Sequence, residues 1–170
     1  MKNKLYVVCG VPGAGKSTFC KKHLTMFGNT VKYVSRDDIR FSIVKENEEY
    51  FSHEAEVFDK FIEEIKNGLI NAEATIADAT HLSPGSRNKL LRNLGSSLKN
   101  CEVIALVFRN GLDTCLRQNE KRAGTRSYVP VDSIKNMYDW FRNPGFDEGF
   151  DKIIVVYPNG EIVIKENCNV

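Results

Sequence analysis

The sequence has few cysteines, in no recognisable pattern, and no long hydrophobic run. Its five cysteines are an odd number without a Cys-x-x-Cys pair, and they stand at positions 9, 20, 101, 115 and 168. This arrangement predicts neither a disulfide framework nor a zinc site. The first apolar stretch, residues 5–9, is too short for a signal-peptide core or a membrane span. We therefore expect a soluble, cytoplasmic protein with reduced thiols and no membrane partner.

An excess of either charge is also lacking. The net charge is +2 over 170 residues, and the 42% hydrophobic and 27% charged content is ordinary for a globular protein. A charge this small neither indicates nor excludes nucleic-acid binding through a local basic patch. The length suits one domain with a sizeable core, and no internal repeat or low-complexity linker divides the chain. We predict a single domain over residues 1–170, and no pattern indicates its oligomeric state.

Residues 10–17 fill the phosphate-binding loop pattern Gly-x-x-x-x-Gly-Lys-Ser. An apolar run precedes the pattern as a strand, and residues 17–26 follow it as a helix, which is the required context. Backbone N–H groups of such a loop surround phosphate oxygens, Lys16 adds charge at the β- and γ-phosphates, and Ser17 offers a hydroxyl to Mg²⁺. The predicted nucleotide-binding residues are Gly13, Ala14, Gly15, Lys16, Ser17 and Thr18.

Strand and helix patterns alternate along the rest of the chain. Apolar or β-branched runs predict strands at residues 30–34, 74–77, 102–108 and 152–157, and residues 161–165 can pair back on the last of these as a hairpin. Helical repeats lie between the runs, and Ser83-Pro84 predicts the start of a helix whose outward face carries Arg87, Lys89 and Arg92. Alternation of this kind is typical of the α/β class. We predict a three-layer α/β/α sandwich with a mainly parallel sheet.

Charged side chains gather where the strand at residues 30–34 ends, in the stretch Ser-Arg-Asp-Asp-Ile-Arg from Ser35 to Arg40. Open α/β sheets place ligands at the carboxyl ends of their strands. Asp37 is placed to accept a proton from an acceptor hydroxyl, and Arg40, one helical turn further, would face the same cleft and pair with a phosphate on the acceptor. Capping of the following helix is an alternative role for Ser35 or Asp37. The glutamate-rich residues 45–56 predict a solvated surface connection.

A carboxylate ends another predicted strand. Asp78 closes the apolar run at residues 74–77 and is followed by Ala79, Thr80 and His81. In enzymes with a phosphate-binding loop, a carboxylate beside the loop holds Mg²⁺ directly or through water. Asp78 is therefore the predicted second partner, with Ser17, of the metal.

Basic residues also gather in residues 117–130, which surround one glycine and end in Val-Pro. Solvated charge is one interpretation of this segment. The other is a mobile lid, because arginines on a hinged segment neutralise a transferring phosphoryl group in kinases. We predict a mobile lid over residues 117–130.

The loop alone serves kinases, ATPases and GTP switches. No Asn-Lys-x-Asp stretch for guanine recognition occurs, and no residue stands out that would orient a hydrolytic water. The pattern favours a small ATP-dependent kinase.

Four stretches together resemble the kinase domain of phage-type polynucleotide kinase: residues 10–18, 35–40, 78–82 and 121–130. The resemblance implies a P-loop kinase fold with an arginine-bearing lid, and ATP and Mg²⁺ as cofactors. It implies that Asp37 is the general base for a DNA or RNA 5′-hydroxyl, that Arg40 binds the acceptor phosphate, and that Thr80 lines the acceptor site. Arg122 would clamp the transferring group from the lid as a catalytic and ATP-binding residue.

The lid departs from this pattern at two positions. Ala123 is inserted between Arg122 and Gly124, and Gln118 stands where a basic residue is expected. Arg117 or Arg126 would then supply the displaced charge, and Arg126 is counted among the predicted ATP-binding residues. The phosphatase motif Asp-x-Asp-Gly-Thr of the phage enzyme is absent from the sequence, so a kinase without that second activity is expected.

Two alternatives stay open. One is a P-loop kinase whose acceptor is a small molecule, such as a nucleoside, an antibiotic or a sugar nucleotide. The other is a non-catalytic ATP-binding module, which would bind ATP without transferring its phosphate.

Overall fold

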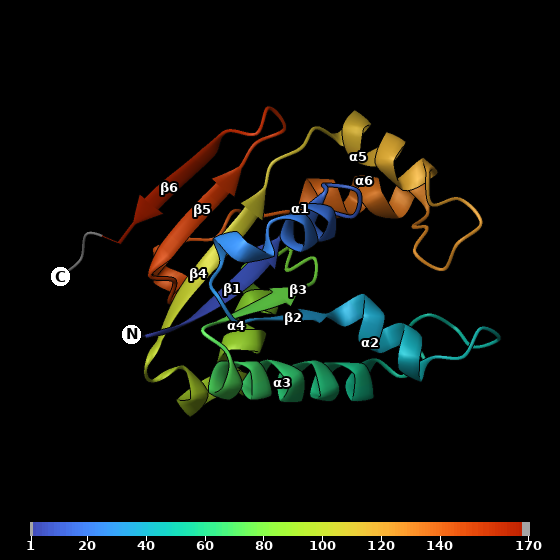
Figure 1. Cartoon of the computed structure of the whole chain (residues 1–170). Helices are drawn as coiled ribbons and strands as arrows, with labels where there is room; N and C mark the ends of the chain where they lie inside the picture. Colours follow the sequence, from blue (N-terminus) through green and yellow to red (C-terminus); the bar gives the residue numbers. More distant parts are fainter. Residues whose placement is uncertain (1, 168–170) are drawn as a thin grey trace.

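A computed structural model describes residues 2–167 and contains one six-stranded sheet with the order β2-β3-β1-β4-β5-β6 (Figure 1). The first five strands are parallel, and β6 is antiparallel to β5, as predicted for the final hairpin. The strands are β1 (Asn3–Cys9), β2 (Val31–Ser35), β3 (Ala74–Asp78), β4 (Cys101–Phe108), β5 (Lys152–Val156) and β6 (Ile162–Glu166). The mainly parallel sheet is therefore confirmed.

Within residues 2–167, six α-helices lie between these strands. They are α1 (Lys16–Lys22), α2 (Arg36–Ile43), α3 (Glu54–Asn71), α4 (Pro84–Leu94), α5 (Leu112–Glu120) and α6 (Val131–Trp140). The helix expected at residues 17–26 is shorter than predicted, because α1 ends at Lys22 and a separate 3₁₀ turn follows at Leu24–Met26. His23, at the junction, has φ −117° and ψ 30°, which is outside the helical region and interrupts the repeat.

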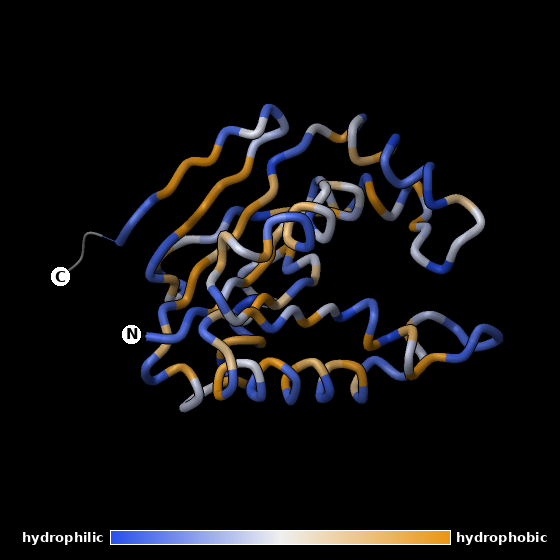
Figure 2. The backbone as a smooth tube through the Cα atoms, in the orientation of Figure 1, coloured by the Kyte–Doolittle hydropathy of each residue, from blue (hydrophilic) through white to orange (hydrophobic). Residues whose placement is uncertain are grey.

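Two apolar layers cover the two faces of the sheet, and this confirms the three-layer arrangement. One layer packs α3 and α4 against strand residues such as Val7 and Ala105, and the other packs α1, α5 and α6 against residues such as Val8 and Leu106. Adjacent strand residues face opposite sides of the sheet, so each central strand serves both layers and is apolar over most of its length. Figure 2 shows α3 hydrophobic on the side toward the sheet and hydrophilic on the outer side.

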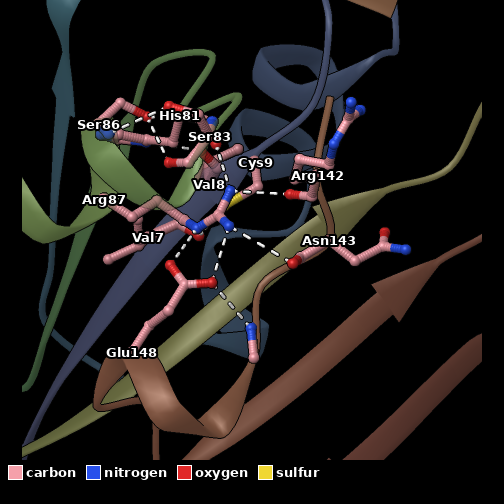
Figure 3. A network of polar contacts seen from close by, with 11 residues as sticks. Val7, Val8, Cys9, His81, Ser83, Ser86, Arg87, Arg142, Asn143 and Glu148 are labelled. Carbon is pink, nitrogen blue, oxygen red and sulfur yellow. Dashed lines mark hydrogen bonds and ion pairs between the residues drawn. The ribbon is translucent and has the colours of Figure 1, made fainter. Parts of the chain in front are cut away.

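The placement predicted for Arg87 on an outward face of α4 is wrong. Its side chain is 0% exposed and forms an ion pair with Glu148, at 2.7 Å from Nε to Oε2, while Nη1 donates 2.9 Å hydrogen bonds to the carbonyls of His81 and Arg142 (Figure 3). Arg87 precedes the buried Leu90 by three residues, so it lies on the same stripe of the helix. The charge is tolerated there because Glu148, in a 3₁₀ turn, neutralises it.

Other local predictions are met. Ser83 caps α4 in a reciprocal capping box with Ser86, and Pro84 occupies the first turn. No helix within residues 2–167 is both long and apolar enough to cross a membrane. Four cysteines are free thiols, and three of them are buried, whereas Cys168 lies outside the described residues.

Candidate active site

The phosphate-binding loop joins β1 to α1 and is packed tightly against α5. Gly13 and Gly15 have φ values of +81° and +87°, in the left-handed region that favours glycine. A Cβ atom at Gly13 would lie 2.2 Å from the backbone oxygen of Cys115. Glycine is therefore required at this position by both its conformation and the close approach of the helix.

Hydrogen bonds hold the loop from two further segments. Asn110, after β4, donates from Nδ2 to the Ala14 carbonyl at 2.8 Å, and the Gly10 N–H donates to the Thr80 carbonyl at 2.9 Å. The backbone of Thr80, predicted to line the acceptor site, is thereby joined to the start of the loop. The loop is fixed before any ligand binds, which lowers the entropic cost of binding phosphate.

Asp78 faces the first turn of α1. It follows Ile76 on the side of β3 that packs toward α1, and its Oδ2 accepts a 2.5 Å hydrogen bond from Ser17 Oγ. The hydroxyl of Tyr33, on the neighbouring strand β2, donates to the same oxygen. Burial and the nearby Asp78 carboxylate raise the pKa of Tyr33, so this hydroxyl stays protonated and donates.

The oxygen atoms of Ser17 and Asp78 fit the ligand set of Mg²⁺. This ion takes hard oxygen donors and often only one or two from the protein, the rest being phosphate oxygens and water. Among the described residues there is no group of three or more His, Cys, Asp or Glu side chains that could hold a metal by themselves. The arrangement suits an ion that arrives with a nucleotide.

Lys16 is the electrostatic centre of the site. It is buried, and its Nζ donates a 2.9 Å hydrogen bond to the Val11 carbonyl. Burial lowers the pKa of Lys16, the carboxylates of Asp78 and Asp37 act to raise it, and the guanidinium of Arg122 acts to lower it. Four predicted site residues, from the loop, α2, β3 and the lid, are thus close enough to interact electrostatically.

Asp37 lies in the first turn of α2, where the chain turns out of β2. Ser35 caps this helix by accepting from the Asp38 N–H, so the capping role belongs to Ser35 and not to Asp37. The Asp37 side chain is 61% exposed and its Oδ1 accepts from Arg40 Nη1 at 3.0 Å and from the Tyr50 hydroxyl at 2.9 Å. Arg40 also donates to the Tyr50 oxygen at 2.9 Å, which closes a triangle of three side chains.

Arg40 is buried and already paired with carboxylates. Besides Asp37, it donates to Glu54 Oε2 at 2.6 Å, and the other oxygen of Glu54 pairs with Arg36. Burial opposes the charge on Arg40, but its hydrogen bond to Glu54 and the nearby acidic groups outweigh it and raise the pKa of Arg40. Residues 45–56, predicted as a solvated connection, therefore contribute two side chains to this cluster.

The lid departs from its predicted bounds because residues 117–120 belong to α5, and the irregular part covers residues 121–130. Its far end is fixed by Asn119, whose side-chain amide exchanges two hydrogen bonds with the backbone of Val129. Arg126, predicted to bind ATP, donates to the carbonyls of Phe41 and Val44 at the end of α2, at 3.3 and 2.6 Å. The guanidinium of Arg122, the other predicted lid arginine, acts to lower the pKa of Lys16.

Four contributors to this site were not predicted: Tyr33, Tyr50, Glu54 and Asn110. The position of Tyr33 could have been predicted from strand alternation. Tyr33 stands two residues before Ser35 at the end of β2, so both side chains face the same side of the sheet, and Ser35 lies opposite Asp78 in the strand register. The other three lie in or beside irregular segments, and no periodic pattern places such residues.

Comparison with known proteins gives a family match and a fold match. A family model described as AAA domain matches residues 5–144. The L-seryl-tRNA(Sec) kinase of Methanococcus maripaludis is 27% identical over 154 residues, covering 86% of this chain and 56% of the relative. The chain thus spans about half the length of this curated relative.

Two solved structures are similar at low sequence identity. One, described as the Pnkp1/Rnl/Hen1 RNA repair complex, has a TM-score of 0.64 with 20% identity and covers 99% of this chain and 51% of that chain. The other, a gluconokinase from Sinorhizobium meliloti 1021, has a TM-score of 0.56 with 17% identity and covers 91% of this chain and 82% of that chain. At these identities the likeness shows the fold, and the predicted P-loop kinase fold is confirmed.

Proposed function

Since the chain belongs to the AAA domain family and has the P-loop kinase fold, we propose that it transfers the γ-phosphoryl group of ATP to a 5′-hydroxyl end of DNA or RNA. The family match and the structural neighbours bear out the predicted resemblance to polynucleotide kinase at the level of domain type. The acceptor is the part that this proposal adds.

The donor half of the reaction rests on the loop. Its backbone N–H groups and Lys16 bind the ATP phosphates, and Arg122 adds positive charge where the transferring group carries negative charge. Ser17 and Asp78 would hold Mg²⁺, which supplies charge neutralisation at the β- and γ-phosphates when it is bound. Tyr33 keeps the Asp78 carboxylate oriented toward Ser17.

The observation that carries the acceptor half is the position of Asp37. Its exposed carboxylate lies at the carboxyl edge of the sheet and acts electrostatically on the buried Lys16. A hydroxyl bound between the two would be hydrogen-bonded to the carboxylate and aimed at the phosphoryl group, and Asp37 would take its proton. Arg40 and the Tyr50 hydroxyl hold the carboxylate in place.

A nucleic-acid acceptor is supported by what similar proteins are described as doing. One relative is described as an L-seryl-tRNA(Sec) kinase, and one structural neighbour as part of an RNA repair complex. In this proposal Thr80 lines the acceptor site. Arg40 releases its ion pair with Glu54 and binds the acceptor phosphate in its place.

One observation favours a second candidate, a kinase of a small hydroxyl compound. Arg40 is already paired with Asp37 and Glu54, so no cation of this cluster is left over for an acceptor phosphate. A small neutral acceptor, such as a nucleoside, needs no such cation. A kinase of a small compound, a gluconokinase, also shares the fold.

A transfer assay separates these functions. The protein is incubated with Mg²⁺ and γ-labelled ATP and with 5′-hydroxyl DNA and RNA oligonucleotides, nucleosides or gluconate, and 5′-phosphorylated oligonucleotides of the same sequence are the matched blocked control. We expect label on the 5′-hydroxyl oligonucleotides alone. Label only on a small compound would show that the acceptor is that compound and not a nucleic acid. ATP binding without transfer to any acceptor would contradict the proposed kinase activity.

A further inference from the structure

Two exposed aromatic side chains lie beside Asp37. Tyr50 and Phe51, in the segment between α2 and α3, are 40% and 66% exposed. This segment and the lid both extend beyond the sheet on the side where α2 and α5 end (Figure 1). Single exposed hydrophobic residues are common on protein surfaces, but this pair is adjacent to the proposed acceptor carboxylate and has a defined geometry.

Tyr50 is held by its hydroxyl, which donates to Asp37 and accepts from Arg40. Phe51 packs edge-to-face against Tyr50, with ring centroids 4.8 Å apart and an interplanar angle of 86°. The Arg40 guanidinium lies 4.4 Å from the Tyr50 centroid and 5.6 Å from the Phe51 centroid. The exposed ring of Phe51 is therefore connected to the Asp37 carboxylate through one side chain, Tyr50, with a buried cation behind both rings.

We propose that the exposed ring of Phe51 is a stacking platform for the unpaired terminal base of the acceptor. This inference rests on the proposed function, since it assigns a binding subsite within the same site. An aromatic face binds any base, because every base has a π face, and stacking needs no phosphate. The platform recognises the acceptor even while Arg40 stays paired with Glu54.

The platform also defines a substrate class. Stacking on Phe51 requires a base with a free π face, and the terminal base of a single-stranded 5′ end supplies one. A sugar acid, which has no π face, gains nothing from the ring. The acceptor is thus selected by its base, and the reacting hydroxyl is positioned at Asp37.

Steady-state kinetics with paired acceptors test the platform. The acceptors are a single-stranded oligonucleotide with a 5′-hydroxyl and the same oligonucleotide with an abasic 5′-terminal residue. We expect Phe51→Ala to raise the KM for the normal acceptor about tenfold or more, with kcat at saturation and the KM for ATP unchanged. The abasic acceptor should show the raised KM with the wild-type protein already and no further rise with the variant.

Two further variants control for fold and surface effects. Phe51→Trp keeps an aromatic face and should retain the low KM. Ile70→Ala removes a side chain at the end of α3 that is more exposed than Phe51 (77% against 66%) and should change nothing. An equal effect of Phe51→Ala on both acceptors, or none on either, overturns the platform while the proposed function stands. If the wild-type protein labels no oligonucleotide, the proposed function fails and the platform with it.

Discussion

Replacing Arg87 by methionine tests the buried ion pair of α4 directly. The substitution keeps an unbranched side chain but removes the guanidinium, so the carboxylate of Glu148, itself only 6% exposed, loses its counter-charge. The carbonyls of His81 and Arg142 also lose their donor. Breaking a buried pair from one side costs about 3–5 kcal/mol. We expect that loss in the free energy of unfolding from urea titration, with a fall in Tm of about 10 °C.

Three comparisons sharpen this prediction. Arg92→Met, an exposed site on the same helix, should stay within about 0.5 kcal/mol of wild type. Replacing both partners, with Arg87→Met and Glu148→Leu, should recover part of the loss, because no unpaired charge is then buried. A loss below about 1 kcal/mol for Arg87→Met would refute the reasoning.

The pH dependence gives an independent measure. In the wild type, burial alone would raise the pKa of Glu148, but the hydrogen bonds from Arg87 and the Gly145 N–H outweigh it and lower the pKa. The pair therefore stabilises the fold above the ordinary pKa of glutamate, and this stability is lost as the pH falls through the lowered value. The gap between wild type and Arg87→Met should be widest near neutral pH and should narrow in acid.

Three further predictions concern the site and its supports. Asp37→Asn should lower kcat about 100-fold or more while ATP binding, followed by calorimetry, stays near wild type, and an unchanged rate would remove Asp37 as the base. Gly13→Ala should abolish ATP binding or destabilise the fold, because the added Cβ lies 2.2 Å from the Cys115 carbonyl, whereas Gly85→Ala in α4 has only an ordinary contact at 3.8 Å and should be tolerated. Burial lowers the pKa of His81 from 6.5 to about 4, so the free energy of unfolding should fall by about 1.4 kcal/mol per pH unit as the pH drops from about 6.5 toward 4. That pH dependence should weaken in His81→Asn, because asparagine does not titrate. Asparagine is chosen because it tolerates the φ of +43° found at this position, and an unaltered slope would assign the dependence to other groups.

The predictable part of the site is the part that periodic structure positions. Ser17 begins a helix directly after a loop of known pattern, and Asp78 ends a strand whose side chains alternate between two faces. Their 2.5 Å contact follows from those two regularities together. The mainly parallel pairing of the strands and the two covered faces of the sheet followed from the alternation of strand and helix patterns.

The unpredicted part depends on irregular segments and on side chains that neutralise one another. Arg40 was predicted to bind an acceptor phosphate, but in the structure it is paired with Glu54 at the start of α3. A ten-residue connection separates α2 from α3, and no sequence pattern determines its path. Arg87 was placed outside because charged residues are rarely buried, although its spacing from Leu90 already put it on the apolar stripe. The missing information was the position of Glu148, which lies in a short 3₁₀ turn.

Under the proposed function, the attachment of the lid to α2 would make the ATP site and the acceptor site thermodynamically dependent on each other. Arg126 donates to the carbonyls of Phe41 and Val44, so residues 121–130 and the end of the helix that carries Asp37 share one pair of hydrogen bonds. A ligand that shifts the lid changes the free energy of those bonds, and the helix responds. Whatever factor ATP applies to the affinity for the acceptor, the acceptor must apply to the affinity for ATP. Because the bond to Val44 is to its backbone carbonyl, a side-chain change at Val44 leaves it in place, whereas a change at Phe41 also removes the ring whose centroid lies 4.8 Å from the Arg126 guanidinium.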